Sequence, residues 1–179
     1  TGHVDIVLLV DASLSMAGEN IAAAKRAAKA FVGELDLARD QAAVIGFNAA
    51  PSVASGLSRN RAALHAAIDG LALGPGTRMD LALREAIDLL LVSPARRPAN
   101  WPVVILLTDG IHEGDGEDVV REAERGRRQG MRLYAIRLGT AASEALLRRV
   151  ADRDGYHEAP TAADLERIYR AIAGEVPCL

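Results

Sequence analysis

The chain has 179 residues and a formal net charge of −3, with half of its residues hydrophobic but only 3% aromatic. A chain of this length can bury a substantial core without disulfides or structural metals, so we expect one domain over residues 1–179, with its core at about 3–174. The modest charge does not suggest a nucleic-acid surface, and no run of about 18 apolar residues is present to span a bilayer.

The first predicted element is a strand that ends in a cluster of side-chain oxygens. The run from Ile6 to Val10 is too short and too continuously apolar for a surface helix, so it predicts a strand buried on both faces of a parallel sheet. Asp11, Ser13 and Ser15 follow on the turn at its carboxyl end, where open α/β sheets bind ligands. Oxygen ligands that converge on such a turn suit Mg²⁺ or Ca²⁺.

Helices and strands then alternate along the chain. Apolar residues at helical spacing predict a helix from about 20 to 37, and the apolar run at 41–47 predicts a second buried strand. The short polar segment at 51–55, which starts with proline, is typical of an edge strand, with Gly56 beyond its end. A second helix is predicted over 61–71.

The next loop presents a hydroxyl group. The sequence Gly74-Pro75-Gly76-Thr77 disfavours both regular structures, so Thr77 is expected on a tight turn. An amphipathic helix follows and ends near Ser93. We interpret Asp80 as the cap of this helix, with an indirect role at a metal as the alternative.

A third buried strand, predicted over 101–108, delivers Asp109 to the same sheet edge as Asp11. Helices are predicted over 118–130, 143–151 and 163–174, and strands over 131–138 and 156–158. The alternation predicts a doubly wound α/β fold: a central, mostly parallel six-stranded sheet with one short antiparallel edge strand and helices on both faces.

The set D-x-S-x-S after a strand, a threonine on a second loop and an aspartate after a later strand resembles the von Willebrand factor A (VWA) domain family. In that family these residues form the metal-ion-dependent adhesion site (MIDAS). The matching residues here are Asp11, Ser13, Ser15, Thr77 and Asp109. The resemblance covers nearly the whole chain and implies one bound divalent cation, Mg²⁺ in the first place and Mn²⁺ or Ca²⁺ as alternatives.

The resemblance also implies a function. We expect a metal-dependent protein-binding module, for adhesion or complex assembly, whose protein partner supplies an Asp or Glu carboxylate to the cation. We expect no enzyme activity, no nucleic-acid partner, no membrane insertion and a monomeric domain. The alternatives are a cis-acting regulatory or assembly module of a larger protein and, less favoured, a metal-dependent hydrolase.

A hydrolase finds little support among the motifs. An aspartyl phosphatase would need an acid at position 13, where this chain has serine, and no glycine-rich phosphate loop follows any strand. Ser13 and Ser15 also lack the G-x-S-x-G elbow of serine hydrolases. A simpler alternative for the D-x-S-x-S turn is a helix cap that binds no metal.

Two features beyond Asp109 receive structural interpretations. The acids Glu113, Asp115, Glu117 and Asp118 are interpreted as a solvated loop and helix start, where acids favour the helix dipole, with a second cation site as the alternative. His112 is interpreted as an exposed loop histidine without an orienting partner.

Three further features of the sequence bear on the source organism and the cellular compartment. Lys25 and Lys29 are the only lysines among the 21 basic residues, and this arginine bias, with the abundance of alanine, indicates a GC-rich bacterium. The single cysteine, Cys178, excludes a disulfide within the chain. Because the chain begins with Thr1 instead of Met, we expect a piece excised from a larger protein. No signal peptide opens the chain, and the compartment stays open, with an extracytoplasmic or cell-surface location slightly favoured over the cytoplasm.

Overall fold

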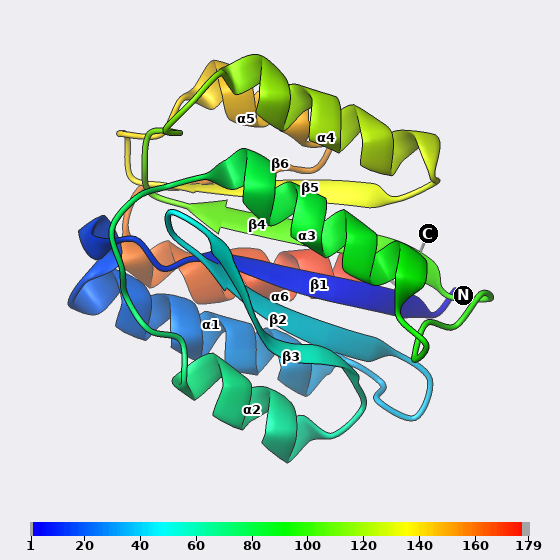
Figure 1. Ribbon diagram of the computed structural model, residues 1–179. Coiled ribbons are helices and arrows are strands. Elements are labelled where there is room, and N and C mark those ends of the chain that lie inside the picture. The colour runs from blue at the N-terminus through cyan, green and yellow to red at the C-terminus, as the bar shows by residue number, and fades with distance from the viewer. Residues whose placement is uncertain (1, 177–179) are drawn as a thin grey trace.

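The computed structural model describes residues 2–176 (Figure 1). Six strands form one sheet in the order β3-β2-β1-β4-β5-β6. Their bounds are β1 Val4–Asp11, β2 Gln41–Phe47, β3 Pro51–Ser58, β4 Trp101–Thr108, β5 Arg132–Leu138 and β6 Tyr156–Ala159. Only β2 and β3 pair antiparallel, and all other neighbours are parallel. The predicted fold class is confirmed.

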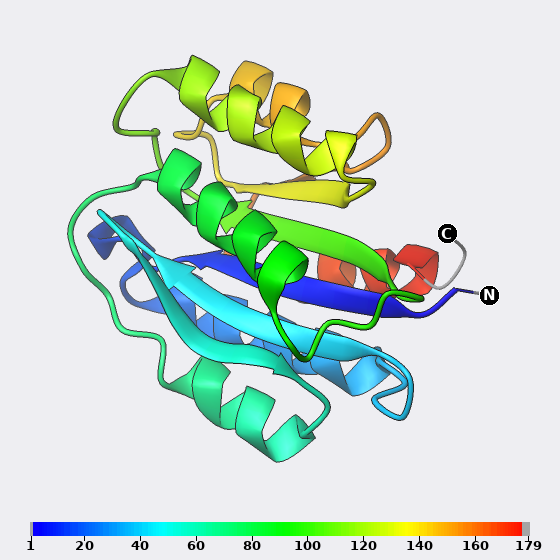
Figure 2. The ribbon, with the colours of Figure 1, turned by 45° about the vertical axis from the view of Figure 1, so that its right-hand side comes forward.

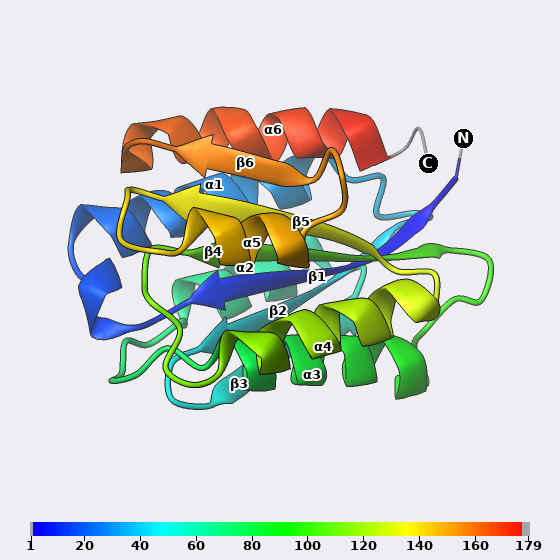
Figure 3. The ribbon, with the colours of Figure 1, turned by 90° about the horizontal axis from the view of Figure 1, so that it is seen from above.

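Helices cover both faces of the sheet (Figure 3). They are α1 Glu19–Glu34, α2 Arg61–Asp69, α3 Met79–Val92, α4 Gly116–Arg128, α5 Glu144–Val150 and α6 Leu165–Glu175, with short 3-10 turns η1 Leu14–Met16 and η2 Ala162–Asp164. Buried residues of α1, α2 and α6 pack against one face. Those of α3, α4 and α5 pack against the other. Within residues 2–176 no helix has the length and hydropathy needed to cross a membrane.

Strand β1 lies at the centre of both cores. Its side chains alternate between the two layers. Ile6 and Leu8 pack on the side of α1, α2 and α6, whereas Val7 and Leu9 pack on the side of α3, α4 and α5. All four are fully buried. Burial on both faces explains why this strand reads as a continuous apolar run rather than an alternating one.

The direction of winding reverses between β1 and β4. Strands β2 and β3 lie on one side of β1, whereas β4, β5 and β6 extend from the other side. The carboxyl ends of β1 and β4 meet at the left of Figure 1. In doubly wound sheets a crevice forms at this reversal, outside the carboxyl ends of the strands.

Two element boundaries differ from the prediction by three residues, and a third, the start of α4, differs by two. Helix α1 stops at Glu34 instead of residue 37, because Leu35 is extended (φ −72°, ψ 139°). Strand β3 continues through Gly56 to Ser58 along the outside of β2, because pairing resumes after a bulge (Figure 2). Helix α4 begins at Gly116, two residues early, because the Asp115 carboxylate accepts a hydrogen bond from the Glu117 amide at 2.9 Å.

The remaining predicted elements match the observed ones to within two residues at each end. Cys178 lies outside the described residues. The assignment of residues 1–179 to one domain stays a prediction.

The capping role predicted for Asp80 is wrong. The cap position of α3 is Arg78, which makes no side-chain capping bond, and Asp80 lies in the first turn. Its buried carboxylate accepts two hydrogen bonds from Arg78, at 2.9 and 2.7 Å. Burial by itself would raise the pKa of Asp80, but the hydrogen bonds from Arg78 and the Leu81 amide, with the Arg78 charge, lower this pKa below its ordinary value.

Replacement of Asp80 by asparagine should destabilise the fold near neutral pH, because Arg78 loses its charged partner. A carboxyl whose folded pKa is lowered stabilises the protein above its unfolded pKa of about 3.9, and this contribution is lost as the pH falls through the folded pKa. Urea unfolding of both proteins should therefore give a stability difference that shrinks below about pH 4. A difference that stays constant from pH 7 to pH 3 would contradict this role, and Asp154→Asn, on an exposed loop, is the control.

Candidate metal site

The two acids of the predicted site meet at the reversal of the sheet. Asp11 is the last residue of β1, and Asp109 directly follows β4. The two strands pair in parallel, with Val10 opposite Leu107, so both carboxylates reach the same edge. Asp11 is fully buried and Asp109 is 9% exposed.

Hydrogen bonds orient the Asp11 carboxylate. Its Oδ1 accepts from the Ser13 amide at 2.8 Å, and its Oδ2 accepts from the Thr108 hydroxyl at 2.7 Å. The Thr108 oxygen in turn accepts from the Gly110 amide at 3.1 Å. Burial raises the pKa of Asp11, and the nearby Asp109 charge adds to this, while the hydrogen bonds from Ser13 and Thr108 oppose it.

The two serines connect this carboxylate to the second one. Their hydroxyl oxygens lie 2.9 Å apart, and the Ser15 hydroxyl donates to Asp109 Oδ1 at 2.7 Å. The Asn20 amide, at the start of α1, reaches Asp109 Oδ2 at 3.5 Å. Neither serine makes a side-chain capping bond, since η1 has none and the cap of α1 is Gly18. The structure therefore does not support the metal-free capping alternative.

The loop that bears Thr77 is held against these residues by its backbone. Gly74 bridges to Ser13 and donates its amide hydrogen to Ala12 at 2.9 Å. The Thr77 carbonyl accepts from the Glu113 amide, also at 2.9 Å. These contacts join the loops that follow β1, α2 and β4.

Gly110 shows how closely the Thr77 loop approaches. A Cβ atom at this position would lie 3.2 Å from the Thr77 hydroxyl oxygen and 3.6 Å from Asp11 Oδ2. Both groups therefore point toward the same backbone segment, and a larger residue there would push them apart. The structure thus brings together all five residues that the sequence motif indicated.

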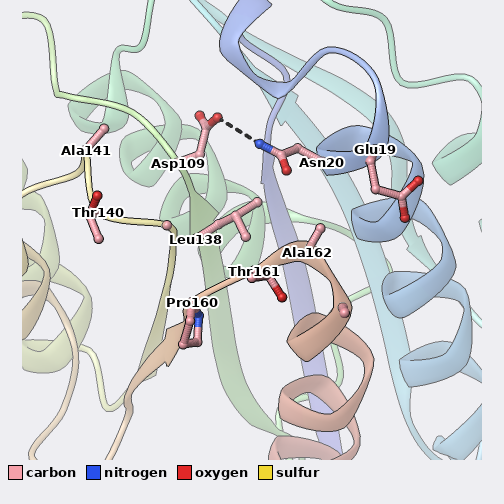
Figure 4. A pocket seen from close by; sticks show the side chains of 11 residues that line it. Glu19, Asn20, Asp109, Leu138, Thr140, Ala141, Pro160, Thr161 and Ala162 are labelled. Atoms are coloured by element: carbon pink, nitrogen blue, oxygen red, sulfur yellow. Dashed lines mark hydrogen bonds between the residues drawn. The ribbon is translucent and has the colours of Figure 1, made fainter.

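Two hollows open at this edge. Ser13, Ser15, Thr77 and Asp109 line a depression of about 380 Å³, whereas Asp11 is fully buried and is not among its lining residues. A second hollow of about 610 Å³ lies beside it, and Figure 4 shows Asp109 on its wall, hydrogen-bonded to Asn20. The two hollows share Asp109 and Ala141.

The interpretation of His112 as an exposed histidine without a partner is wrong. Its side chain is only 3% exposed, and its Nδ1 accepts a hydrogen bond from the Met79 amide at 3.3 Å. Its Nε2 lies 3.9 Å from Asp80 Oδ1. His112 thus joins the loop after β4 to the start of α3. Sequence reasoning missed this residue and Thr108, because both contacts cross between distant segments.

Three of the four acids beyond Asp109 have separate structural partners, and the fourth, Glu113, lines the depression. Asp115 caps α4, Glu117 pairs with Arg149 through two hydrogen bonds at 2.6 and 2.9 Å, and Asp118 pairs with Arg121. Across residues 2–176, no group of three or more His, Cys, Asp or Glu side chains is arranged to hold a metal ion. The second cation site therefore has no support.

Comparisons with known proteins point to one family. Residues 5–171 match the model of the von Willebrand factor type A domain. The chain is 32% identical to Matrilin-4 of Homo sapiens over 159 residues, which are 84% of this chain but 25% of Matrilin-4. It therefore spans about a quarter of the length of that relative.

Solved structures of other proteins have the same fold as this chain. Proximal thread matrix protein 1 from the mussel byssus, solved with a zinc occupied MIDAS motif, is 26% identical with a TM-score of 0.84, over 96% of this chain and 45% of that one. The von Willebrand factor type A structure from Catenulispora acidiphila, 23% identical over 98% of this chain and 43% of that one, has a TM-score of 0.85 and supports the fold alone. Because relatives come from animals and bacteria, the bacterial source stays a prediction.

The family match over most of the chain and the strand order agree with the resemblance that the sequence motif suggested. This chain belongs to the von Willebrand factor type A domain family.

Proposed function

We propose that this chain is a protein-binding module that holds one divalent cation, Mg²⁺ by preference, at the carboxyl edge of its sheet. Ser13 and Ser15 bind the cation directly, and Asp11, Thr77 and Asp109 complete its shell directly or through water. The observation that carries this proposal is the convergence of carboxylate and hydroxyl oxygens from three loops at one depression. The mussel relative with zinc in its MIDAS supports a divalent cation in this family.

The donor set fits a hard cation. All five side chains offer oxygen, which suits Mg²⁺, Mn²⁺ or Ca²⁺. Adjacent corners of an octahedron with Mg–O distances of 2.0–2.1 Å are about 2.9 Å apart. The serine oxygens lie 2.9 Å apart, so both can bind one such cation without moving relative to each other.

The hydrogen bond from Ser15 is also compatible with a cation. Its hydroxyl hydrogen points to Asp109, so the oxygen can still offer a lone pair to a metal. In this arrangement Asp109 accepts from a ligand and does not need to touch the cation. A cation bound in this way has neutral hydroxyl oxygens as direct ligands and keeps several waters, and a carboxylate of a protein partner can replace one of these waters.

A relative suits a structural or adhesive role. The mussel protein is a thread matrix protein of the byssus. We therefore propose an adhesive or assembly role outside the cytoplasm, as a monomeric domain that binds neither nucleic acid nor membrane. A cis-acting module within a longer protein is the second candidate, because the chain spans only a quarter of Matrilin-4.

A hydrolase would need a base beside the hydroxyls. His112, the nearest candidate in sequence, is buried with Nδ1 occupied by the Met79 amide. It therefore cannot accept a proton there without losing that hydrogen bond. This geometry argues against hydrolysis.

Calorimetry should detect one Mg²⁺ per chain, and this binding should disappear in Ser13→Ala and in Asp109→Ala, because each variant removes an oxygen of the set. Mg²⁺ should also raise the melting temperature of the wild-type chain but not that of the variants. Ser55→Ala, on the exposed edge strand β3, is the matched control. Unchanged binding in both site variants would refute the ligand assignment.

A partner carboxylate can be sought with peptides selected from a random display library on the domain in Mg²⁺ and eluted with EDTA. Conversion of the critical acid of such a peptide to its amide should abolish binding, as EDTA does. Peptide binding that survives either change would mean that recognition lies elsewhere.

Glu113 allows a second test of the prediction that a partner carboxylate reaches the cation. It is the only one of the four acids beyond Asp109 that lines the depression. Glu113→Gln should therefore strengthen acidic-peptide binding by about twofold at low salt and by less at physiological salt, where charges are screened over about 8 Å. Glu124→Gln, on α4 and outside the depression, should have no effect.

A further inference from the structure

Two large apolar side chains stand exposed at the metal depression. Leu14 is 60% exposed and lies between the two serines, and Ile111 is 69% exposed and lies two residues after Asp109. Both line the same depression as the candidate metal ligands. The other exposed large apolar side chains within residues 2–176 are Val53, Leu73, Val92 and Trp101, none of which lines it.

Neither Leu14 nor Ile111 packs in the hydrophobic core. The η1 turn is anchored by Met16, which is fully buried, while Leu14 in the same turn faces outward. A single exposed leucine needs no explanation. Two such side chains from different loops, both lining one polar depression, place apolar surface next to the charged centre, as expected of a binding site.

The charges around the depression limit what can bind there. Asp109 and Glu113 are the only ionisable residues among those that line it. A cation offers a position for one acid, whereas Glu113 repels a second acid nearby. The rim of Leu14 and Ile111 offers no hydrogen-bonding side chain, so a polar neighbour of the first acid would lose water without a replacement partner.

We propose that the partner is a protein segment in which the acid that reaches the cation is flanked by an apolar residue, and that Leu14 and Ile111 contact that residue. This inference rests on the proposed function and adds the side-chain class that the site selects. Contact between these apolar groups excludes water from the carboxylate and the cation, and the lower local dielectric strengthens their attraction.

The test compares the double variant Leu14→Ser/Ile111→Ser with the double variant Val53→Ser/Val92→Ser, whose residues are exposed elsewhere. Each is titrated with Mg²⁺ alone and then with EDTA-eluted peptides from the display library. In the first variant, peptide affinity should fall at least about tenfold, because burial of apolar side chains is lost. Its Mg²⁺ affinity should stay unchanged, because the oxygen ligands remain. The second variant should match wild type in both measurements.

The composition of the selected peptides gives a second readout. An apolar residue should be enriched at the positions next to the critical acid when the wild-type domain is used, and this enrichment should vanish on the Leu14→Ser/Ile111→Ser variant. Intact Mg²⁺ binding with acid-dependent peptides that ignore both substitutions would overturn this inference and leave the proposed function standing. If the wild-type chain does not bind Mg²⁺ at all, the proposed function is overturned, and this inference with it.

Discussion

The candidate site depends on the parallel pairing of β1 with β4 at the centre of the sheet. This pairing aligns the ends of two strands that are far apart in the sequence and places Asp11 and Asp109 at one edge. The core on both faces holds the pair in register, because a shift of one residue would turn every apolar side chain of β1 to the opposite layer. The core therefore fixes where the two acids lie along the edge, and hydrogen bonds from the adjacent loop orient their carboxylates.

The same arrangement carries an electrostatic cost. Asp11 is fully buried, so its charged form is disfavoured, and a second carboxylate nearby adds to the penalty. Hydrogen bonds from the Ser13 amide and the Thr108 hydroxyl offset part of this cost. A divalent cation would offset more of it, which is why we interpret the acids as a binding centre. Unfavourable local arrangements, such as two neighbouring buried carboxylates, are expected at functional sites, where the rest of the fold supplies the stability.

The surrounding loops are supported from outside the oxygen cluster. His112 links the loop after β4 to the start of α3, and the bidentate pair of Arg78 with Asp80 closes the first turn of that helix. These contacts join the start of α3, next to Thr77, to the loop that contains Asp109. A centre held on such supports can bind a cation without large rearrangement, and its exposed apolar rim is free to distinguish partners.

The local pattern of residues by itself determined the buried strands and the candidate site residues of this protein. The apolar runs of β1, β2 and β4 specified buried parallel strands, and the family motif indicated Asp11, Ser13, Ser15, Thr77 and Asp109, because strand ends and glycine loops are local features. Only the tertiary structure decided the roles of Thr108, His112 and Asp80. Each is defined by a partner on another segment or by the exact start of a helix, and element boundaries are set by such competing contacts. The exposure of Leu14 and Ile111 was equally undecided, because an apolar residue on a loop becomes buried or exposed only when the rest of the chain packs around it.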